Sequence, residues 1–371
     1  MSKHFLKEYL FEYSKKNKIN EDYPVYSVTN SNGFCTEYFN KDVSSQDKRS
    51  YKLVPYGYFA YNPSRINVGS IDCQRKEKAV IVSPLYNVFG TTKDIDSEYL
   101  LYFFKSNYGK HLINSNTSGS VRSNLKLETL FNFKINIESL ERQKQKVYVL
   151  NKICKFIKLE EKKLSLLDEL IKSRFVEMFE NKGFETQKLE SLCVSKAEYG
   201  AGSASVPYAD GRPRYVRITD INDDGTLNDD YVCSINEQDD LDYKLSYGDF
   251  MFARMGATVG KTYMFMSGNE IYAGYLIRYK LDLNKINPRF LFAFTKTNEY
   301  WLWVKNNQSG AAQPGINAKK YNILEIPVPP IELQNEFAAF VEQVDKSKFV
   351  VQKRIELYKE LLNKKMDEYF N

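Results

Sequence analysis

Histidine is nearly missing from this sequence. The 371 residues include only two, His4 and His111, and neither lies near a group of cysteines. Zinc sites and general acid–base catalysis both rely on histidine, so candidate residues for either are few. We interpret the two histidines as incidental surface residues. The sequence therefore predicts no catalytic residue and no metal site.

Paired cysteines and long apolar runs are also missing. The five cysteines stand at positions 35, 73, 154, 193 and 233 and form no CxxC pair. An odd, scattered set is typical of reduced thiols and predicts a cytoplasmic protein. The N-terminal stretch MSKHFLKEYLFEYSKKNK has no apolar centre, and no run approaches 18 apolar residues. We therefore expect neither a signal peptide nor a membrane-spanning helix.

Motifs for nucleotide hydrolysis, methyl transfer and DNA cleavage are incomplete. Gly256–Thr262 (GATVGKT) is similar to a phosphate-binding loop, but three residues separate its glycines where that loop has four. No Asn/Asp-Pro-Pro-aromatic tetrad of an amino methyltransferase is present, and no nuclease-type carboxylate pair is evident. We expect no bound cofactor on this chain, while Lys261 and its turn remain suited to gripping a DNA phosphate.

What is present, instead, is a strong signal for a long helix at mid-chain. Residues 139–179 contain neither Gly nor Pro and are rich in Lys, Glu and Leu. Nine positions there follow one another at alternating intervals of three and four residues, a seven-residue repeat that is typical of a coiled-coil seam. These are Leu150, Ile153, Ile157, Glu160, Leu164, Leu167, Ile171, Arg174 and Met178. A single long core helix is the alternative interpretation.

The same pattern returns 191 residues later. The nine matching positions are Val341, Val344, Lys348, Val351, Ile355, Tyr358, Leu362, Lys365 and Tyr369, and all but the two lysines are apolar or aromatic. Flanking residues match at this offset too, as Gln143 does with Gln334. The second copy follows Pro329-Pro330, which favours a helix start. The chain is therefore predicted to be a tandem repeat of a block followed by a long helix.

Each block combines strand and helix signals. In the first block we predict strands at 23–28, 57–61, 79–82 and 131–137, a helix at 97–107 and a polar loop at 114–124. Gly57 and Gly69 are matched by Gly248 and Gly260 in the second block. The predicted fold is α+β, with blocks at 1–137 and 182–329 and long helices at 138–181 and 330–371.

Three segments of the second block stand in a distinctive order. They are Arg214–Ile221 (RYVRITDI), Tyr247–Lys261 (YGDFMFARMGATVGK) and Gln308–Asn317 (QSGAAQPGIN), the last leading into the second long helix. With the 191-residue repeat, they resemble the specificity (S) subunits of Type I restriction-modification systems. The first block departs from the pattern, with YSVT ending at Thr29 and SVRSN at 120–124.

The resemblance implies a non-catalytic DNA-binding subunit with two target recognition domains. Each domain would read one half of a bipartite site in double-stranded DNA. The long helices would pair antiparallel, set the spacer and bind modification (methyltransferase) subunits, which bring S-adenosylmethionine. Restriction subunits, which use ATP and Mg²⁺, would join that complex. The net charge of +6 permits DNA binding without demonstrating it.

Candidate DNA contacts are polar and basic side chains in predicted loops, because these types read base edges or bind phosphate. In the second block they are Arg217, Thr219, Asn222, Arg254, Thr258, Lys261, Gln313 and Asn317. In the first block they are Tyr26, Thr29, Asn30, Arg65, Asn67, Arg122 and Asn124. Arg254 is the strongest candidate, since it follows a predicted strand and precedes a glycine turn.

Three alternatives stay open. Each candidate residue could be an ordinary polar surface side chain. The whole chain could be a coiled-coil scaffold with two peptide-binding domains and no DNA specificity. It could also be an enzyme whose active site has no recognisable motif. Sequence-specific, salt-sensitive DNA binding discriminates the scaffold from a DNA-binding subunit.

Overall fold

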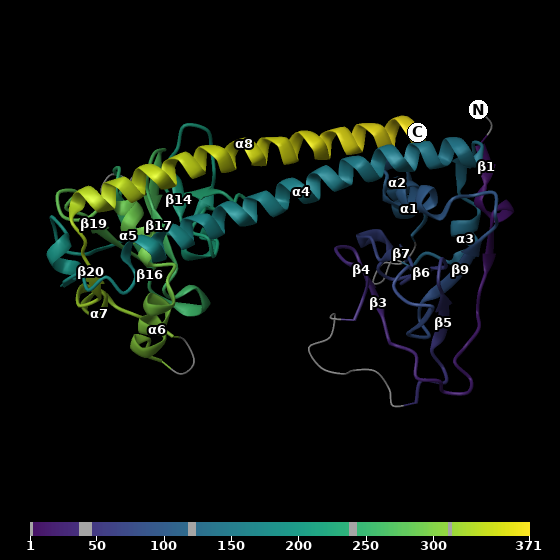
Figure 1. Ribbon diagram of the computed structural model, residues 1–371, viewed down its shortest axis with the longest axis horizontal. Coiled ribbons are helices and arrows are strands. Elements are labelled where there is room, and N and C mark those ends of the chain that lie inside the picture. Colours follow the sequence, from purple (N-terminus) through teal and green to yellow (C-terminus); the bar gives the residue numbers. More distant parts are fainter. Residues whose placement is uncertain (1–2, 37–46, 118–123, 237–242, 311–313) are drawn as a thin grey trace. The chain divides into compact units, whose positions relative to one another are not determined.

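The computed structural model describes residues 3–36, 47–117, 124–236, 243–310 and 314–371 (Figure 1). The chain divides into two compact units, one formed by Met1–Lys162 with Val351–Asn371 and the other by Lys163–Val350. Each unit therefore contains one block and a part of each long helix. Among the described helices, none combines the length and the apolar character that a membrane crossing requires.

The two long helices are α4 (Leu140–Phe179) and α8 (Ile331–Phe370), each 40 residues long. All eighteen predicted seam positions, nine in each helix, are buried or half-buried. In the first unit, the ring of Phe156 stacks on that of Tyr358, with centroids 5.5 Å apart. In the second, Phe175 packs against Phe337 at 5.6 Å.

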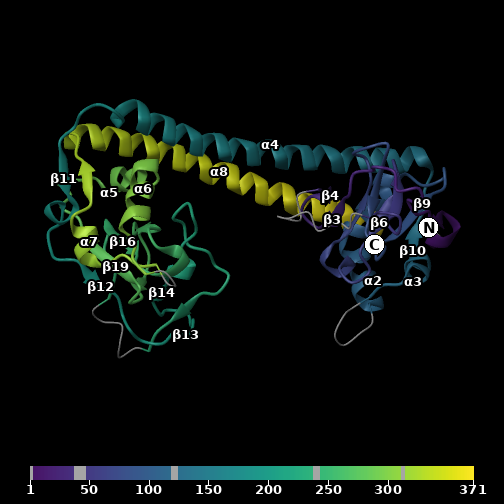
Figure 2. The same cartoon turned by 90° about the horizontal axis from the view of Figure 1, so that it is seen from below.

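The direction of the pairing follows from such contacts within each unit. In the first unit, the contacts of α4 with α8 run from Lys146 with Tyr369 to Glu160 with Arg354. Residue numbers rise along one helix and fall along the other. The helices are therefore antiparallel, and the predicted coiled coil is confirmed. In Figure 1 and Figure 2, α8 runs beside α4 within each unit.

The block of the first unit is built around a four-stranded antiparallel sheet. Its strands, in spatial order, are β2 (Leu10–Glu12), β9 (Asn87–Thr91), β6 (Phe59–Tyr61) and β7 (Ile71–Cys73). The smaller pairs are β1 (Lys3–Phe5) with β10 (Lys134–Asn136), β3 (Ser27–Thr29) with β4 (Gly33–Cys35), and β5 (Lys52–Pro55) with β8 (Ala79–Val82). The helices are α1 (Ser97–Lys105), α2 (Asn107–Asn116) and α3 (Leu127–Phe131).

The block of the second unit has the same central sheet. Its strands, in the corresponding order, are β12 (Glu198–Tyr199), β19 (Leu276–Lys280), β16 (Asp249–Ala253) and β17 (Thr262–Met264). The pairs are β11 (Thr186–Lys188) with β20 (Glu325–Pro327), β13 (Val206–Pro207) with β15 (Cys233–Ser234), and β14 (Arg214–Val216) with β18 (Glu270–Tyr272). The helices are α5 (Pro288–Phe294), α6 (Asn298–Asn307) and α7 (Ala318–Asn322).

Aromatic side chains fill the space between each sheet and its helices. In the first unit, Phe59 and Phe89 stack with centroids 5.0 Å apart, and both are fully buried. In the second, Phe252 packs against Tyr321 at 4.6 Å. Large buried rings contribute most of the hydrophobic stabilisation of small domains, which explains the aromatic-rich composition.

A buried glutamine attaches each long helix to its block. In the first unit, the side chain of Gln143 accepts from the Asp96 amide at 2.8 Å and donates to the Asp94 carbonyl at 3.2 Å. In the second, Gln334 accepts from the Asn287 amide at 2.9 Å and donates to the carbonyl of Lys285 at 3.1 Å. All partners match at the 191-residue offset, so the repeat extends to individual hydrogen bonds.

The C-terminal end of the other long helix packs on the same block. Phe370, at the end of α8, lies 4.9 Å from Tyr99 of α1 between ring centroids. Phe179, at the end of α4, lies 4.8 Å from Phe290 of α5. Each block therefore binds the start of one long helix and the end of the other.

The predicted helix at 97–107 is interrupted. The extended backbone of Ser106, with ψ 161°, ends α1, and its hydroxyl accepts from the Gly109 amide at 3.0 Å to begin α2. Helix α2 continues to Asn116, into the predicted loop at 114–124. Its polar sequence, NYGKHLINSN, has weak intrinsic helix propensity, and burial of Ile113 supports the helix instead. The predicted strand at 131–137 is shorter, because α3 occupies residues up to Phe131.

Candidate nucleic-acid interface

One end of the second unit's central sheet collects several of the candidate DNA contacts. Because the strands are antiparallel, β12 and β16 end where β19 and β17 begin. The turn from β16 to β17 lies at this end and contains Arg254, Thr258 and Lys261. At the other end, β19 leads within a few residues to the partners of Gln334. The candidates therefore lie opposite the attachment of the long helix.

Arg254 extends from the end of β16 between two tyrosines. Its guanidinium carbon lies 5.0 Å from the centre of the Tyr199 ring and 5.5 Å from that of Tyr275. Its Nε donates to the carbonyl of Gly274 at 3.1 Å. The side chain is half-buried, whereas Tyr199 and Tyr275 are 45% and 53% exposed. The guanidinium is thus held in place at the surface.

A loop from a distant part of the chain packs on the backbone at Arg254. The amide of Ile316 donates to the Arg254 carbonyl at 2.9 Å, and that of Gly256 donates to Pro314 at 2.9 Å. The exposed Asn317 begins α7 by accepting from the Lys320 amide at 3.0 Å. Asn317 therefore lies near Arg254. Gln313 falls outside the described residues.

The glycine turn after β16 does not form a phosphate cradle. The amides of Val259, Gly260 and Lys261 donate to the carbonyls of Gly256, Ala253 and Thr258. Thr258 itself donates its hydroxyl to the Met255 carbonyl at 3.1 Å. A phosphate-binding loop needs such amides to point at the ligand. The geometry therefore agrees with the incomplete motif.

Lys261 connects this turn to a neighbouring acidic loop. Its Nζ lies 2.7 Å from Asp223 Oδ1 and donates to the Ile221 carbonyl at 3.2 Å. In the same loop, Asn222 donates to the Thr226 hydroxyl at 3.0 Å. Lys261 is thus paired within the protein. A pair with a carboxylate that is 95% exposed is weak, so a phosphate can compete for the lysine.

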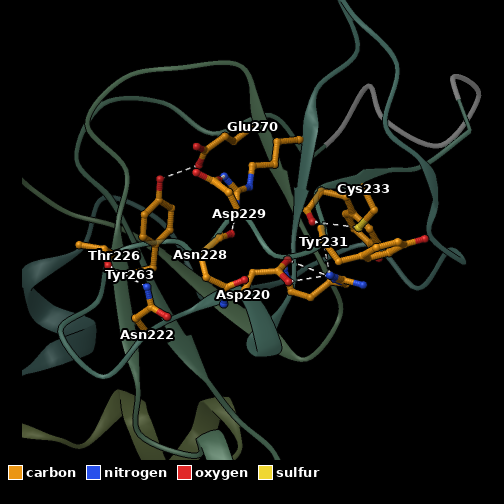
Figure 3. Close-up of polar contacts among 12 residues, drawn as sticks. Asp220, Asn222, Thr226, Asn228, Asp229, Tyr231, Cys233, Tyr263 and Glu270 are labelled. Atoms are coloured by element: carbon orange, nitrogen blue, oxygen red, sulfur yellow. Dashed lines mark hydrogen bonds and ion pairs between the residues drawn. The ribbon is translucent and has the colours of Figure 1, made fainter. Parts of the chain in front are cut away.

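Arg217 is held by the segment that follows β14. Its guanidinium donates to both carboxylate oxygens of Asp220, at 2.7 and 3.1 Å, and to the carbonyl of Tyr231 at 3.0 Å. The bond to Asp220 raises the pKa of the Arg217 guanidinium. Thr219 lies beside the same carboxylate at 3.4 Å. Figure 3 shows Asp220 and Tyr231 at this site. Arg217 cross-links the loop, and several of its donors point into the protein.

A second charged group lies between β14, β17 and β18 (Figure 3). The hydroxyl of Tyr263 donates to Glu270 at 2.6 Å. Burial raises the pKa of Glu270, although that bond and the positive charge of Arg214 lower it in part. Arg214 is itself paired with Asp229 at 2.7 Å. The Tyr263–Glu270 bond joins β17 to β18, and β18 pairs with β14, the strand that leads into Arg217.

The first unit gathers its candidates at the corresponding end of its sheet. The turn from β6 to β7 carries the exposed Arg65 and Asn67. Its Ser70 hydroxyl donates to the Val28 carbonyl at 2.7 Å, which holds the hairpin of Thr29 and Asn30 against the turn. Leu125, which follows the exposed Asn124, donates its amide to the Pro63 carbonyl at 3.1 Å.

Two first-block candidates differ from this group. Tyr26 packs partly into the core, with its ring 6.4 Å from that of Phe34. Arg122 falls outside the described residues. The backbone bond between Leu125 and Pro63 repeats the bond between Ile316 and Arg254 at the 191-residue offset. Pro63, and not Arg65, therefore stands at the position of Arg254.

Sequence reasoning missed Tyr199 and Tyr275. Each stands next to a glycine, in Tyr199-Gly200 and Gly274-Tyr275. A Cβ at Gly200 would lie 2.4 Å from the carbonyl oxygens of Tyr272 and Ala273, so the two segments approach each other closely there. An aromatic residue beside a glycine at a strand end is the signal that could have indicated them.

Comparison with known families decides the assignment. The model of the Type I restriction modification DNA specificity domain matches residues 6–169 and matches again over residues 181–359. The chain belongs to this family. The two matches agree with the two halves of the repeat, so each half corresponds to one copy of the family's domain.

Curated relatives and solved structures agree with this family. The chain is 23% identical over 276 residues to the StySPI specificity subunit of Salmonella potsdam, a match that covers 68% of this chain and 59% of the relative. It is 36% identical to the Escherichia coli EcoDI specificity subunit over 61 residues, which are 16% of this chain and 14% of that one. The matched stretches thus span 59% or less of these relatives.

Two solved structures have similar folds. A chain described under complex assembly and conformational transition of the type I R-M system superposes with a TM-score of 0.63 at 16% identity, covering 99% of this chain and 97% of that one. The S subunit of a Type I system from M. genitalium gives a TM-score of 0.54 at 12% identity, covering 100% and 96%. Both likenesses concern the fold alone.

Proposed function

We propose that this chain is the DNA-reading, non-catalytic subunit of a Type I restriction-modification complex. Each block reads one half of a bipartite site with the loops at the end of its central sheet. The observation that carries the proposal is that these loops occupy the same end in both units, opposite the attachment of the long helix. Equivalent surfaces with different side chains suit two half-sites of different sequence.

The long helices supply the docking surface for methyltransferase subunits. In the second unit, Leu166 and Leu170 of α4 are 51% and 46% exposed; in the first, Leu159 and Leu357 are 53% and 62% exposed. These side chains lie outside the seam and are available to a partner. The family assignment favours the methyltransferase as that partner, and the restriction subunits then join the complex.

Cofactors belong to the partners in this proposal. S-adenosylmethionine is expected on the methyltransferase subunits, and ATP and Mg²⁺ on the restriction subunits. All five cysteines are free, which fits the reducing cytoplasm where such a complex meets chromosomal DNA.

Mapping of methylated bases tests the proposal. The chain is expressed with its methyltransferase subunits in a host without other methylation, and the genome is sequenced for modified bases. We expect one bipartite motif with a fixed spacer, absent when this chain is left out. Methylation that persists without this chain, or that follows no motif, contradicts the proposal.

The docking surface is tested separately. Leu166→Glu with Leu170→Glu places two charges on the exposed face of α4, while Glu169→Gln on the same exposed stretch is the control. We expect the double variant to lose co-purification with the methyltransferase subunit while the chain remains folded by circular dichroism. Unchanged co-purification would place the docking surface elsewhere.

A further inference from the structure

The arrangement around Arg254 defines how one base is read. We propose that Tyr199 and Tyr275 are positioning residues that present the two terminal amino groups of Arg254 to a guanine in the major groove of one half-site. This inference rests on the proposed function and deepens it, since it assigns a base and a geometry to one side chain.

The first step of the argument is the orientation of the guanidinium. Its Nε is used by the Gly274 carbonyl, at 3.1 Å. Within the described part of the chain, Nη1 and Nη2 make no hydrogen bond or ion pair. Only these two nitrogens remain for a ligand, and they form the outer edge of the planar group. Arg254 therefore has one donor pair to offer, aimed along the side chain.

The second step concerns the two rings. A guanidinium near aromatic faces at about 5 Å is attracted to them and prefers a few orientations over free rotation. Tyr199 is itself anchored, because its hydroxyl accepts from the Ala318 amide at 3.2 Å. Arginine otherwise loses considerable rotamer entropy on binding, so a pre-oriented side chain discriminates better.

The third step is the choice of ligand. Guanine presents two acceptors, O6 and N7, in the major groove, and paired arginine donors match them. A DNA phosphate also accepts paired donors, but lysine, hydroxyl, amide and backbone N–H groups contact phosphates as well, so a phosphate contact does not require a fixed planar donor pair. Arg254 has a fixed orientation and lies at the end of the central sheet that carries the candidate loops. Both features favour a contact with a base over a contact with the DNA backbone.

The last step is the asymmetry between the two halves. Pro63 occupies the position of Arg254 in the first unit and has no side-chain donor. The first block must read its half-site with other side chains. The guanine contact of Arg254 is thus expected only in the half-site that the second block reads, and the other half-site provides an internal control for every experiment on Arg254.

The experiment begins with the wild-type complex and modified DNA. Duplexes carry the mapped site with one guanine at a time replaced by 7-deazaguanine, which removes N7 and keeps Watson–Crick pairing. We expect a guanine in the half-site of the second block at which this replacement weakens binding severalfold. The proposed function fails if the complex prefers no site at all. A specific complex that has no such guanine overturns the inference alone.

Variants then connect that guanine to Arg254. Arg254→Lys should weaken binding of the natural duplex by roughly 5- to 150-fold, the cost of one bidentate pair. It should also abolish the effect of 7-deazaguanine at that one position and leave the other half-site unchanged. An effect that is the same for every duplex would instead indicate a phosphate contact and contradict the proposal.

Tyr275, the more exposed of the two tyrosines, is tested by matched substitutions. Tyr275→Phe keeps the ring and should retain the sequence preference, whereas Tyr275→Ala should relax discrimination at the same base pair only. Tyr247→Ala, at another tyrosine that is 61% exposed, is the control. If Tyr275→Ala changes no base preference while Arg254→Lys does, Tyr275 has no positioning role.

Discussion

At the scale of the residue, two buried glutamines connect the helices to the blocks. Gln143 is fully buried, and its side chain forms hydrogen bonds with three backbone groups, those of Asp94, Asp96 and Glu138. A buried backbone group without a partner costs about 1–3 kcal/mol. The sequence showed that Gln143 and Gln334 match, but not what they bind, because two of the three partners of each glutamine lie 47 and 49 residues away.

Removal of one glutamine should loosen one unit. We expect Gln143→Ala to lower the free energy of unfolding of the first unit by about 2–3 kcal/mol, since several buried polar groups lose their partners. Hydrogen exchange of the amides in α1 measures this loss of stability. Gln145→Ala, on the exposed face of α4, is the control. Equal exchange in both variants would mean that water replaces the side chain.

Lys296 predicts a pH dependence of the second unit. Its Nζ donates to the Asp223 carbonyl at 3.0 Å, and burial lowers the pKa of this amine to about 8, against an ordinary value of 10.5. Between these two values the unfolded chain holds more protons on Lys296 than the folded chain. The free energy of unfolding should therefore rise with pH from about 8 to 10.5.

Denaturation curves measured between pH 8 and 10.5 test whether Lys296 causes this rise in the free energy of unfolding. Below pH 8 the amine is charged in both states, and the folded chain bears the full cost of burying it. Lys296→Met should remove the rise between pH 8 and 10.5, whereas Lys305→Met, at an exposed lysine of α6, should keep it. A rise that survives in Lys296→Met belongs to other groups.

At the scale of the element, the helices with the strongest periodic pattern of apolar residues were the ones that the sequence predicted best. Helix α4 was predicted at 139–179 and is observed at 140–179, because heptads and the lack of Gly and Pro act along its whole length. Helix α2 was missed, because Ser106 and the packing of Ile113 decide it. The gathering of the candidate loops at one sheet end was also not predictable, since it depends on strand order.

Under the proposed function, the length of the helix pair should set the spacer of the DNA site. Both ends of each helix are fixed, α8 by Gln334 and by Phe370 on Tyr99. To lengthen the helix pair, an insertion is therefore needed in both α4 and α8. Duplication of Lys158–Leu164 in α4 together with Phe349–Ile355 in α8 keeps the seam in phase and adds about 10 Å.

Methylation mapping of this variant gives the outcome. We expect the spacer to grow by about three base pairs, at about 3.4 Å each, while both half-site sequences stay the same. The added base pairs also rotate one half-site about the DNA axis relative to the other, so affinity for DNA should fall unless the helix pair twists to follow. The single duplication in α4 is the control, and it should lose activity because Phe370 no longer reaches Tyr99. An unchanged spacer in an active double variant would show that the helices do not set the distance.

At the scale of the whole molecule, the chain should act only with its partners. Four amides of the Gly256–Thr262 turn, those of Gly256, Val259, Gly260 and Lys261, donate to carbonyl groups of the protein. We therefore expect the purified chain neither to hydrolyse ATP nor to bind S-adenosylmethionine. Calorimetry and phosphate release measure both. Lys261→Ala should only weaken DNA binding, with a salt slope lower by about 0.9. ATP turnover that disappears in Lys261→Ala would contradict this account.

Each block binds the start of one long helix and the end of the other, and this arrangement suggests how such a chain could arise. A half-length protein, one block and one helix, lacks the helix end that packs on its own block, and a second copy supplies it. Two identical copies would complete each other as a symmetric dimer restricted to a palindromic target. Fusion of the two copies into one polypeptide removes that restriction. Each half can then acquire its own loops, as Pro63 and Arg254 illustrate, and under the proposed function the DNA target no longer has to be symmetric.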